Sequence, residues 1–250
     1  MKTYKNLATQ FYELAKTAEN ADAEIAFYAA YAAQANGLIL EPMCGSGRVL
    51  LPLLARGYAI EGFDASAAML AALAKKNAVI SDEPAPVWQQ FLQHFGNGKK
   101  YALIIIPFGS FGLVLKRDEA LSALKNLRNH LIPGGRLIME IDTVHSAHGP
   151  QGVARCATRW RSDGATIGVR AIIEYDETTQ IFSSQSCYEL RHDGGVTTEQ
   201  EHFEQYLYQY DKFDALAQMA GFAVVDRYSD YTYQRVTSES PLILYVLSFK

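Results

Sequence analysis

The stretch that decides the fold of this chain reads LILEPMCGSGR over residues 38–48, and an acid follows it at Asp64. The apolar run at its start suits a strand buried within a parallel sheet. Gly45 and Gly47 come next in a tight turn, and the leucine-rich run behind them predicts a helix that packs back on the sheet. A second short strand over 59–63 leads to Asp64. The stretch therefore predicts a strand, a glycine turn, a helix and a second strand.

This unit has the features of a nucleoside site. Glycines lack a Cβ, so a ligand can approach the backbone of the turn closely, and the free N–H groups at the helix start favour a negative group. Asp64 stands where a carboxylate can accept two hydrogen bonds from a ribose diol. A dinucleotide fingerprint needs a third glycine, and Leu50 takes its place here. Glu41, opposite the turn, suits a cationic or hydroxyl-bearing ligand better than a pyrophosphate.

Two motifs carry a resemblance to a known family. They read E-x-x-C-G-S-G-R over 41–48 and D-A-S-x-x-M-L over 64–70, and they resemble those of the class I S-adenosylmethionine-dependent methyltransferases. The run L-x-P-G-G-x-L over 131–137 and the Ala-Gly-Phe step at 220–222 are further family hallmarks. The resemblance covers nearly the whole chain. It implies an α/β fold with a Rossmann-like, doubly wound, seven-stranded sheet and S-adenosylmethionine as the cofactor.

The resemblance also implies which residues hold that cofactor, at the ends of the parallel strands. They are Glu41, Met43, Cys44, Gly45, Gly47, Arg48, Asp64, Ala65, Met69, Gln90, Phe91, Leu92 and Pro107. Two positions depart from the family pattern. Met43 stands where the family mostly has glycine, and Phe91 stands where the family usually has an acid for the adenine amine. Gln90 would then supply the polar contact and Leu92 an apolar one, or Phe91 is simply a core residue.

Candidate catalytic residues lie in two places. The resemblance implies an N-terminal aromatic segment that folds over the cofactor as a lid, and Tyr12 is the best candidate for it. His145 and His148 follow the strand that ends near Asp142, where a histidine can act as a general base near neutral pH. Both histidines also fit solvated loop positions. An amine can lose its proton before it attacks, so a dedicated base is optional.

Local signals predict the other elements. Residues 1–36 are expected to be helical, and Ser66 and Asp118 are expected to cap helices that follow them. Pro133-Gly134-Gly135 is expected to stop the second of these helices. A final antiparallel hairpin over 223–228 and 242–247 closes the sheet.

Residues 150–210 predict an antiparallel β-meander inserted into a single methyltransferase domain that spans 1–250. Apolar residues alternate over 166–175, and Asp163-Gly164 and Asp193-Gly194-Gly195 are hairpin turn signals. The resemblance is greatest to the methyltransferase branch that carries such an insert. Inserts of this kind cover the active site, carry substrate contacts or form a homodimer.

Composition restricts the partners. A net charge of −4 gives no electrostatic case for nucleic acid or an anionic membrane. Pro107-Phe108 lacks the preceding polar residue of family members that methylate base nitrogens, which argues against a nucleobase substrate.

The chain shows no signal peptide, no apolar stretch long enough to span a bilayer, and no cysteine–histidine spacing for a metal. Three dispersed cysteines predict a reduced, cytoplasmic setting.

The sequence therefore predicts transfer of a methyl group from S-adenosylmethionine to a nitrogen or oxygen of a small molecule. A catalytically silent binding protein of the same fold is the alternative. A nicotinamide-dependent dehydrogenase is disfavoured by the missing third glycine.

Overall fold

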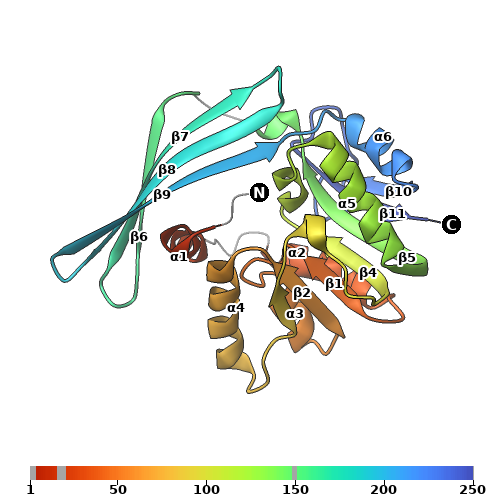
Figure 1. The fold of residues 1–250 in the computed structure, drawn as a ribbon, viewed down its shortest axis with the longest axis horizontal. Coiled ribbons are helices and arrows are strands. Elements are labelled where there is room, and N and C mark those ends of the chain that lie inside the picture. The colour runs from red at the N-terminus through yellow and green to blue at the C-terminus, as the bar shows by residue number, and fades with distance from the viewer. Residues whose placement is uncertain (1–3, 16–20, 148–150, 250) are drawn as a thin grey trace.

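The chain forms two β-sheets of different kinds in a computed structural model that describes residues 4–15, 21–147 and 151–249 (Figure 1). The larger sheet has seven strands in the order β10-β11-β5-β4-β1-β2-β3. These strands are β1 Ile39–Pro42, β2 Ile60–Asp64, β3 Val87–Gln89, β4 Tyr101–Ile106, β5 Leu131–Asp142, β10 Ala223–Tyr228 and β11 Leu242–Ser248. The first five pair in parallel, whereas β11 is antiparallel to both β5 and β10. The predicted doubly wound seven-stranded sheet and its C-terminal hairpin are confirmed.

Helices cover both faces of this sheet. They are α1 Asn6–Ala15, α2 Ala21–Ala32, α3 Leu50–Ala55, α4 Ala67–Ile80, α5 Arg117–Asn129 and α6 Lys212–Met219, with short 3-10 turns η1 Leu92–His94, η2 Ser110–Leu113 and η3 Val144–Ser146. One core cluster joins α5 and α6 to one face, and a second joins α2 and α3 to the other. Successive residues of β4 alternate between the two clusters, which explains why this strand reads as a continuous apolar run.

Local signals placed the start of α4 correctly and misplaced other helix ends. Among the described residues of the segment 1–36, only Asn6–Ala15 and Ala21–Ala32 are helical. Ser66 caps α4 as predicted, because its hydroxyl accepts from the N–H of Met69 at 3.1 Å. The prediction for Asp118 was wrong: Lys116 is the N-cap of α5, and Asp118 lies in the first turn, where a carboxylate still favours the helix dipole. The predicted stop at 133–135 was also wrong. Helix α5 ends at Asn129, and 133–135 lie within β5, which pairs with β4 across a register shift.

The smaller sheet is the predicted insert. Its antiparallel strands are β6 Ala154–Trp160, β7 Thr166–Asp176, β8 Ile181–His192 and β9 Gly195–Tyr206, in that order. The turn between β8 and β9 is Asp193-Gly194, with φ of 49° and 76°, as the tightest hairpin turn requires. Figure 1 shows this sheet standing beside the seven-stranded one, with α1 packed between the insert and α4.

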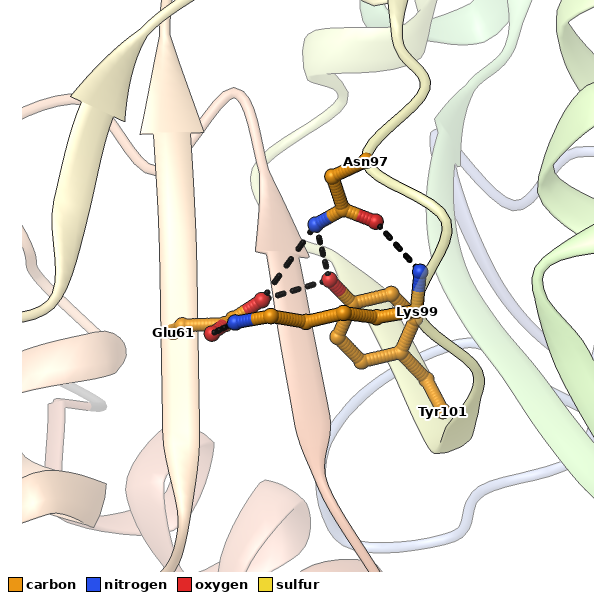
Figure 2. Close-up of polar contacts among 4 residues, drawn as sticks. All are labelled: Glu61, Asn97, Lys99 and Tyr101. Atoms are coloured by element: carbon orange, nitrogen blue, oxygen red, sulfur yellow. Dashed lines mark hydrogen bonds and ion pairs between the residues drawn. The ribbon is translucent and has the colours of Figure 1, made fainter.

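A polar network around two buried side chains, Glu61 and Tyr101, joins two strands near the amino ends of the parallel strands (Figure 2). Glu61 of β2 is 6% exposed, and it accepts from the Tyr101 hydroxyl at 2.5 Å and from Lys99 Nζ at 2.6 Å. Asn97 Nδ2 donates to the same tyrosine oxygen at 2.6 Å. Tyr101 begins β4, so these contacts reach across β1. A hydroxyl donor and a lysine ammonium group together offset the cost of burying the Glu61 carboxylate.

We expect Tyr101→Phe to lower the free energy of unfolding by about 1–3 kcal/mol, because a buried carboxylate loses a hydrogen bond. Urea denaturation followed by circular dichroism measures the change. Tyr58→Phe is the matched control, since the hydrogen bond of the Tyr58 hydroxyl to the described residues is a 3.4 Å contact with the Ala29 carbonyl. Equal losses in the two variants would contradict the importance of the network.

Candidate active site

A cavity of about 200 Å³ opens at the carboxyl ends of the parallel strands. Most of the predicted site residues line it, namely Tyr12, Glu41, Met43, Cys44, Gly45, Arg48, Asp64, Ala65, Met69, Gln90, Leu92 and Pro107. Gly47, Phe91 and His145 lie outside this lining. The 37% exposed Phe91 instead faces an open groove toward the insert, and His145 lies half-buried in η3. His148 falls outside the described residues.

The Asp64 carboxylate fixes the shape of the glycine turn. Its Oδ2 accepts from the N–H of Gly45 at 2.8 Å, and its Oδ1 accepts from the N–H of Ser66 at 2.7 Å. Burial raises the pKa of Asp64, while these backbone donors pull the pKa back down. Each carboxylate oxygen keeps a second lone pair. Asp64 is therefore held rigidly at the cavity and can still accept hydrogen bonds from a ligand.

The two glycines of the turn have different surroundings. A Cβ on Gly45 would meet only Met69 Sδ at 3.9 Å, so this position is open toward the cavity. Gly47 has φ of 75°, and a Cβ there would lie 2.9 Å from Leu51 Cγ and 3.0 Å from the Leu73 side chain. Gly47 is thus needed for the packing of α3 and α4 against the turn. Close approach of a ligand is expected at Gly45 alone.

Glu41 presents a buried carboxylate with a free oxygen. It is 2% exposed, and its Oε2 has no hydrogen-bond partner among the described residues. Burial raises the pKa of Glu41 well above its usual value, and the neighbouring Glu24 and Asp64 carboxylates raise it further. A ligand that brings a cation or a hydroxyl group to this oxygen would relieve both effects.

Arg48 joins the cavity to a second layer of buried acids. Its Nε lies 2.6 Å from Oε2 of Glu24, whose side chain is fully buried. Tyr231 donates to Oε1 of Glu140 at 2.9 Å and to Oε1 of Glu24 at 3.3 Å. Burial raises the pKa of Glu140 to about 7. Sequence reasoning did not select Glu24, Glu140 or Tyr231 for the site. A signal was available for Glu140, because it is a single acid within the apolar run of β5.

Helix α1 covers the cavity from the N-terminal side. Glu13 accepts from the Ser46 hydroxyl and pairs with Lys76 Nζ at 3.0 Å, which fastens α1 to the glycine turn and to α4. Tyr12 lies edge-on to Phe108, with ring centroids 6.1 Å apart. Glu199 of β9 accepts from the N–H groups of Leu7 and Ala8 at the start of α1. The structure thus places Tyr12 at the cavity, on a helix held by both the core and the insert.

Gln90, expected to supply the polar contact to adenine, already makes two hydrogen bonds within the protein. The Gln90 side chain accepts from Trp88 Nε1 at 2.9 Å, and its Nε2 donates to the His94 carbonyl at 2.7 Å. One lone pair and one N–H of this amide therefore stay free for a ligand. Leu92 is buried beside it and lines the same wall.

The lining also includes residues that were not among the predicted cofactor-binding and catalytic residues. They are Tyr4, Ser46, Val49, Ser66, Phe108, Gly109, Ser110, Leu113, Asp142, Phe203 and Gln205. Phe203 and Gln205 belong to β9 of the insert, where a polar, alternating strand gave no signal for a site. Asp142 is the last residue of β5, and an acid at a strand end is a signal for a site that the sequence did offer.

Two classes of feature are missing from the described residues. No cluster of three or more histidines, cysteines or acids there is arranged to hold a metal ion. No helix in the described ranges has both the length and the apolar character to cross a membrane.

Comparison with known proteins gives one family match. Residues 39–135 match the model of a family described as a methyltransferase domain. No curated protein matches the chain.

Solved structures match over most of the length of this chain. The CcbJ methyltransferase from Streptomyces caelestis has a TM-score of 0.74 and 21% identity, covering 94% of this chain and 92% of that chain. The sugar N-methyltransferase KedS8 from Streptoalloteichus sp. has a TM-score of 0.75 and 18% identity, covering 98% and 96%. The S-adenosylmethionine-bound CalS10, an amino pentose methyltransferase from Micromonospora echinaspora, has a TM-score of 0.69 and 16% identity, covering 98% of both chains. At these identities the likeness shows a shared fold.

We expect Arg48→Met to lower the free energy of unfolding by about 3 kcal/mol, since it removes the guanidinium that lies 2.6 Å from the buried Glu24 carboxylate. Urea denaturation measures the loss, and the double variant Arg48→Met/Glu24→Gln should recover at least half of it. Arg56→Met is the control, because Arg56 is exposed and its hydrogen bond within the described part of the chain is a 3.4 Å contact to the Ile25 carbonyl. A double variant no more stable than Arg48→Met would contradict the pairing.

Proposed function

We propose that this chain is a class I S-adenosylmethionine-dependent methyltransferase and that it methylates a nitrogen or oxygen atom of a small molecule. The methyltransferase-domain match over 39–135 and the fold shared with solved methyltransferases support this proposal. The observation that carries the proposal is the covered cavity. Its floor comes from the parallel strand ends, and its cover comes from α1 and β9. A site enclosed in this way suits a small acceptor better than a polymer.

The charges of the cavity fit the cofactor. Its lining holds three acids, Glu41, Asp64 and Asp142, and one cationic side chain, Arg48, which already pairs with Glu24. S-adenosylmethionine carries a sulfonium and an ammonium group against one carboxylate, so it complements an acidic cavity. We expect Asp64 to accept from the ribose hydroxyls and the free Oε2 of Glu41 to face the ammonium group. The other predicted cofactor residues would surround the adenosine and methionine parts.

When bound, the cofactor supplies a methyl group activated by the positive sulfur. The chain has to align an acceptor with that methyl group and to exclude water. Tyr12 and Phe108 form an aromatic wall suited to both tasks, because their rings lie edge to face at the cavity. His145 lies outside the lining, so we propose no base role for it.

Two structural relatives support a small-molecule acceptor that carries an amine. KedS8 is titled a sugar N-methyltransferase, and CalS10 is titled an amino pentose methyltransferase. The unpaired cysteines, two exposed and one buried, support a reduced, cytoplasmic setting.

A catalytically silent cofactor-binding protein is the second candidate. Met43 favours it, since this non-glycine residue has φ of 59° at a position where the family mostly has glycine. A chain that binds S-adenosylmethionine and methylates no acceptor from a broad set of amines, phenols and carboxylates would support this candidate.

Calorimetry with S-adenosylmethionine and S-adenosylhomocysteine tests the cofactor assignment. We expect both to bind, and we expect Asp64→Asn to weaken binding by about tenfold or more, because a hydrogen-bonded charge is lost.

The control for this experiment is Asp82→Asn, which removes an exposed carboxylate in the loop after α4. Thermal melting of each variant shows that the protein is folded. Absence of binding at millimolar cofactor, or equal affinities for the wild type and Asp64→Asn, would refute the assignment.

A further inference from the structure

Asp142 lies in the half of the cavity that the cofactor residues leave open. The predicted cofactor residues lie mostly on or after β1, β2 and β3, at one side of the sheet. Strands β4 and β5 lie on the other side of β1, and Asp142 is the last residue of β5. The cavity lining there comes from the segment after β4, in which Pro107 is a predicted cofactor residue, from Asp142 and from the end of β9. An acceptor bound beside the cofactor would lie in this half.

The Asp142 carboxylate is held in a definite orientation. Gln205 Nε2 donates to Asp142 Oδ2 and to the Gly109 carbonyl at 3.2 Å, so one side chain of the insert joins β5 to the segment after β4. The Asp142 carbonyl accepts from the N–H of Tyr208 at 3.0 Å, which brings the chain just after β9 beside the end of β5.

Gly109 leaves the space that this carboxylate occupies. It has φ of 61°, and a Cβ there would overlap Asp142 Oδ2 and lie 3.1 Å from Gln205 Nε2. A side chain at 109 would therefore displace the Asp142–Gln205 pair. The absent side chain and the glutamine from the insert together present one carboxylate to the cavity.

No cation of the described residues neutralises this carboxylate. The neighbour that acts on it is the neutral amide of Gln205, and burial raises the pKa of Asp142 while that amide lowers it. Glu24 by contrast has Arg48, and Glu61 has Lys99. A half-buried acid at a cavity wall without a counterion is complementary to a cationic ligand group.

We propose that Asp142 is the acceptor-binding carboxylate, that it selects a primary or secondary amine over a hydroxyl group, and that Gln205 is its positioning residue. This inference rests on the proposed function. The acceptor binds as an ammonium ion, and one N–H proton passes to the Asp142 carboxylate. The freed lone pair forms the N–C bond while the C–S bond breaks, and the electron pair of that bond stays on sulfur. Asp142 releases its proton to water after the methylated ammonium product leaves.

Binding of matched probe pairs to the chain saturated with S-adenosylhomocysteine tests the proposal without turnover. The pairs are cyclohexylamine and cyclohexanol, phenethylamine and phenethyl alcohol, and glucosamine and glucose. Calorimetry should show at least one amine that binds about tenfold or more tightly than its alcohol. Asp142→Asn should abolish this preference, and Gln205→Leu should reduce it, while the affinity for S-adenosylhomocysteine and for the alcohol stays within about twofold in both variants.

Glu177→Gln is the matched control, since it removes an exposed carboxylate from the turn between β7 and β8 of the same insert. It should keep the full preference. With S-adenosylmethionine, transfer should go to nitrogen. Asp142→Asn should both raise KM for the amine and lower kcat, because the variant loses the charge that binds the ammonium group and the group that accepts its proton.

The outcomes separate the two proposals. A wild type that binds no S-adenosylhomocysteine refutes the proposed function itself. A wild type that binds it but shows no preference for any amine overturns the role of Asp142, as does a preference that survives in Asp142→Asn. If Asp142 only fastens the insert to the core, the variants lower the melting temperature and leave the preference intact.

Discussion

The structure of the site depends on one carboxylate held by two backbone N–H groups. Asp64 at the end of β2 accepts from Gly45 in the turn after β1 and from Ser66 at the start of α4. The turn after β1, the end of β2 and the start of α4 therefore meet at one side chain. Since the same oxygens keep free lone pairs, the contact that shapes the turn also presents a ligand acceptor at the cavity. Stability and binding are thus coupled at this residue.

Around that anchor, the site accumulates negative charge that the protein neutralises only in part. Glu24 has Arg48, and Glu140 has the hydroxyls of Tyr28 and Tyr231, whereas Glu41 keeps an unpartnered oxygen. Buried acids without counterions are costly, because the charged form loses its hydration. A cationic cofactor and a cationic acceptor would each supply missing positive charge. The acids left unpaired by the fold therefore indicate where ligands belong.

Sequence reasoning succeeded where local rules govern. The apolar strands, the Ser66 cap, the Asp193-Gly194 turn and the glycine turn follow from periodicity, capping and backbone conformation, and each is in place. The helix boundaries at 117 and 129 were missed, because an acid in the first turn and a cap position give similar sequence signals. Gly47 and Gly45 looked equivalent, and only the positions of Leu51 and Leu73 separate their roles.

The sequence by itself determined the single strands, the hairpins of the insert and the acids at the strand ends, since each depends on residues close together along the chain. The seven-stranded sheet was expected from the resemblance to a family. Tertiary structure decided what surrounds them. Arg48 meets Glu24 across 24 positions, Gln205 meets Asp142 across 63, and Glu199 meets the start of α1 across more than 190. Such contacts form only after sheets and helices have packed, and a polar residue on a strand carries no local mark of its distant partner. The folded chain, rather than any motif, therefore placed the insert over the cavity.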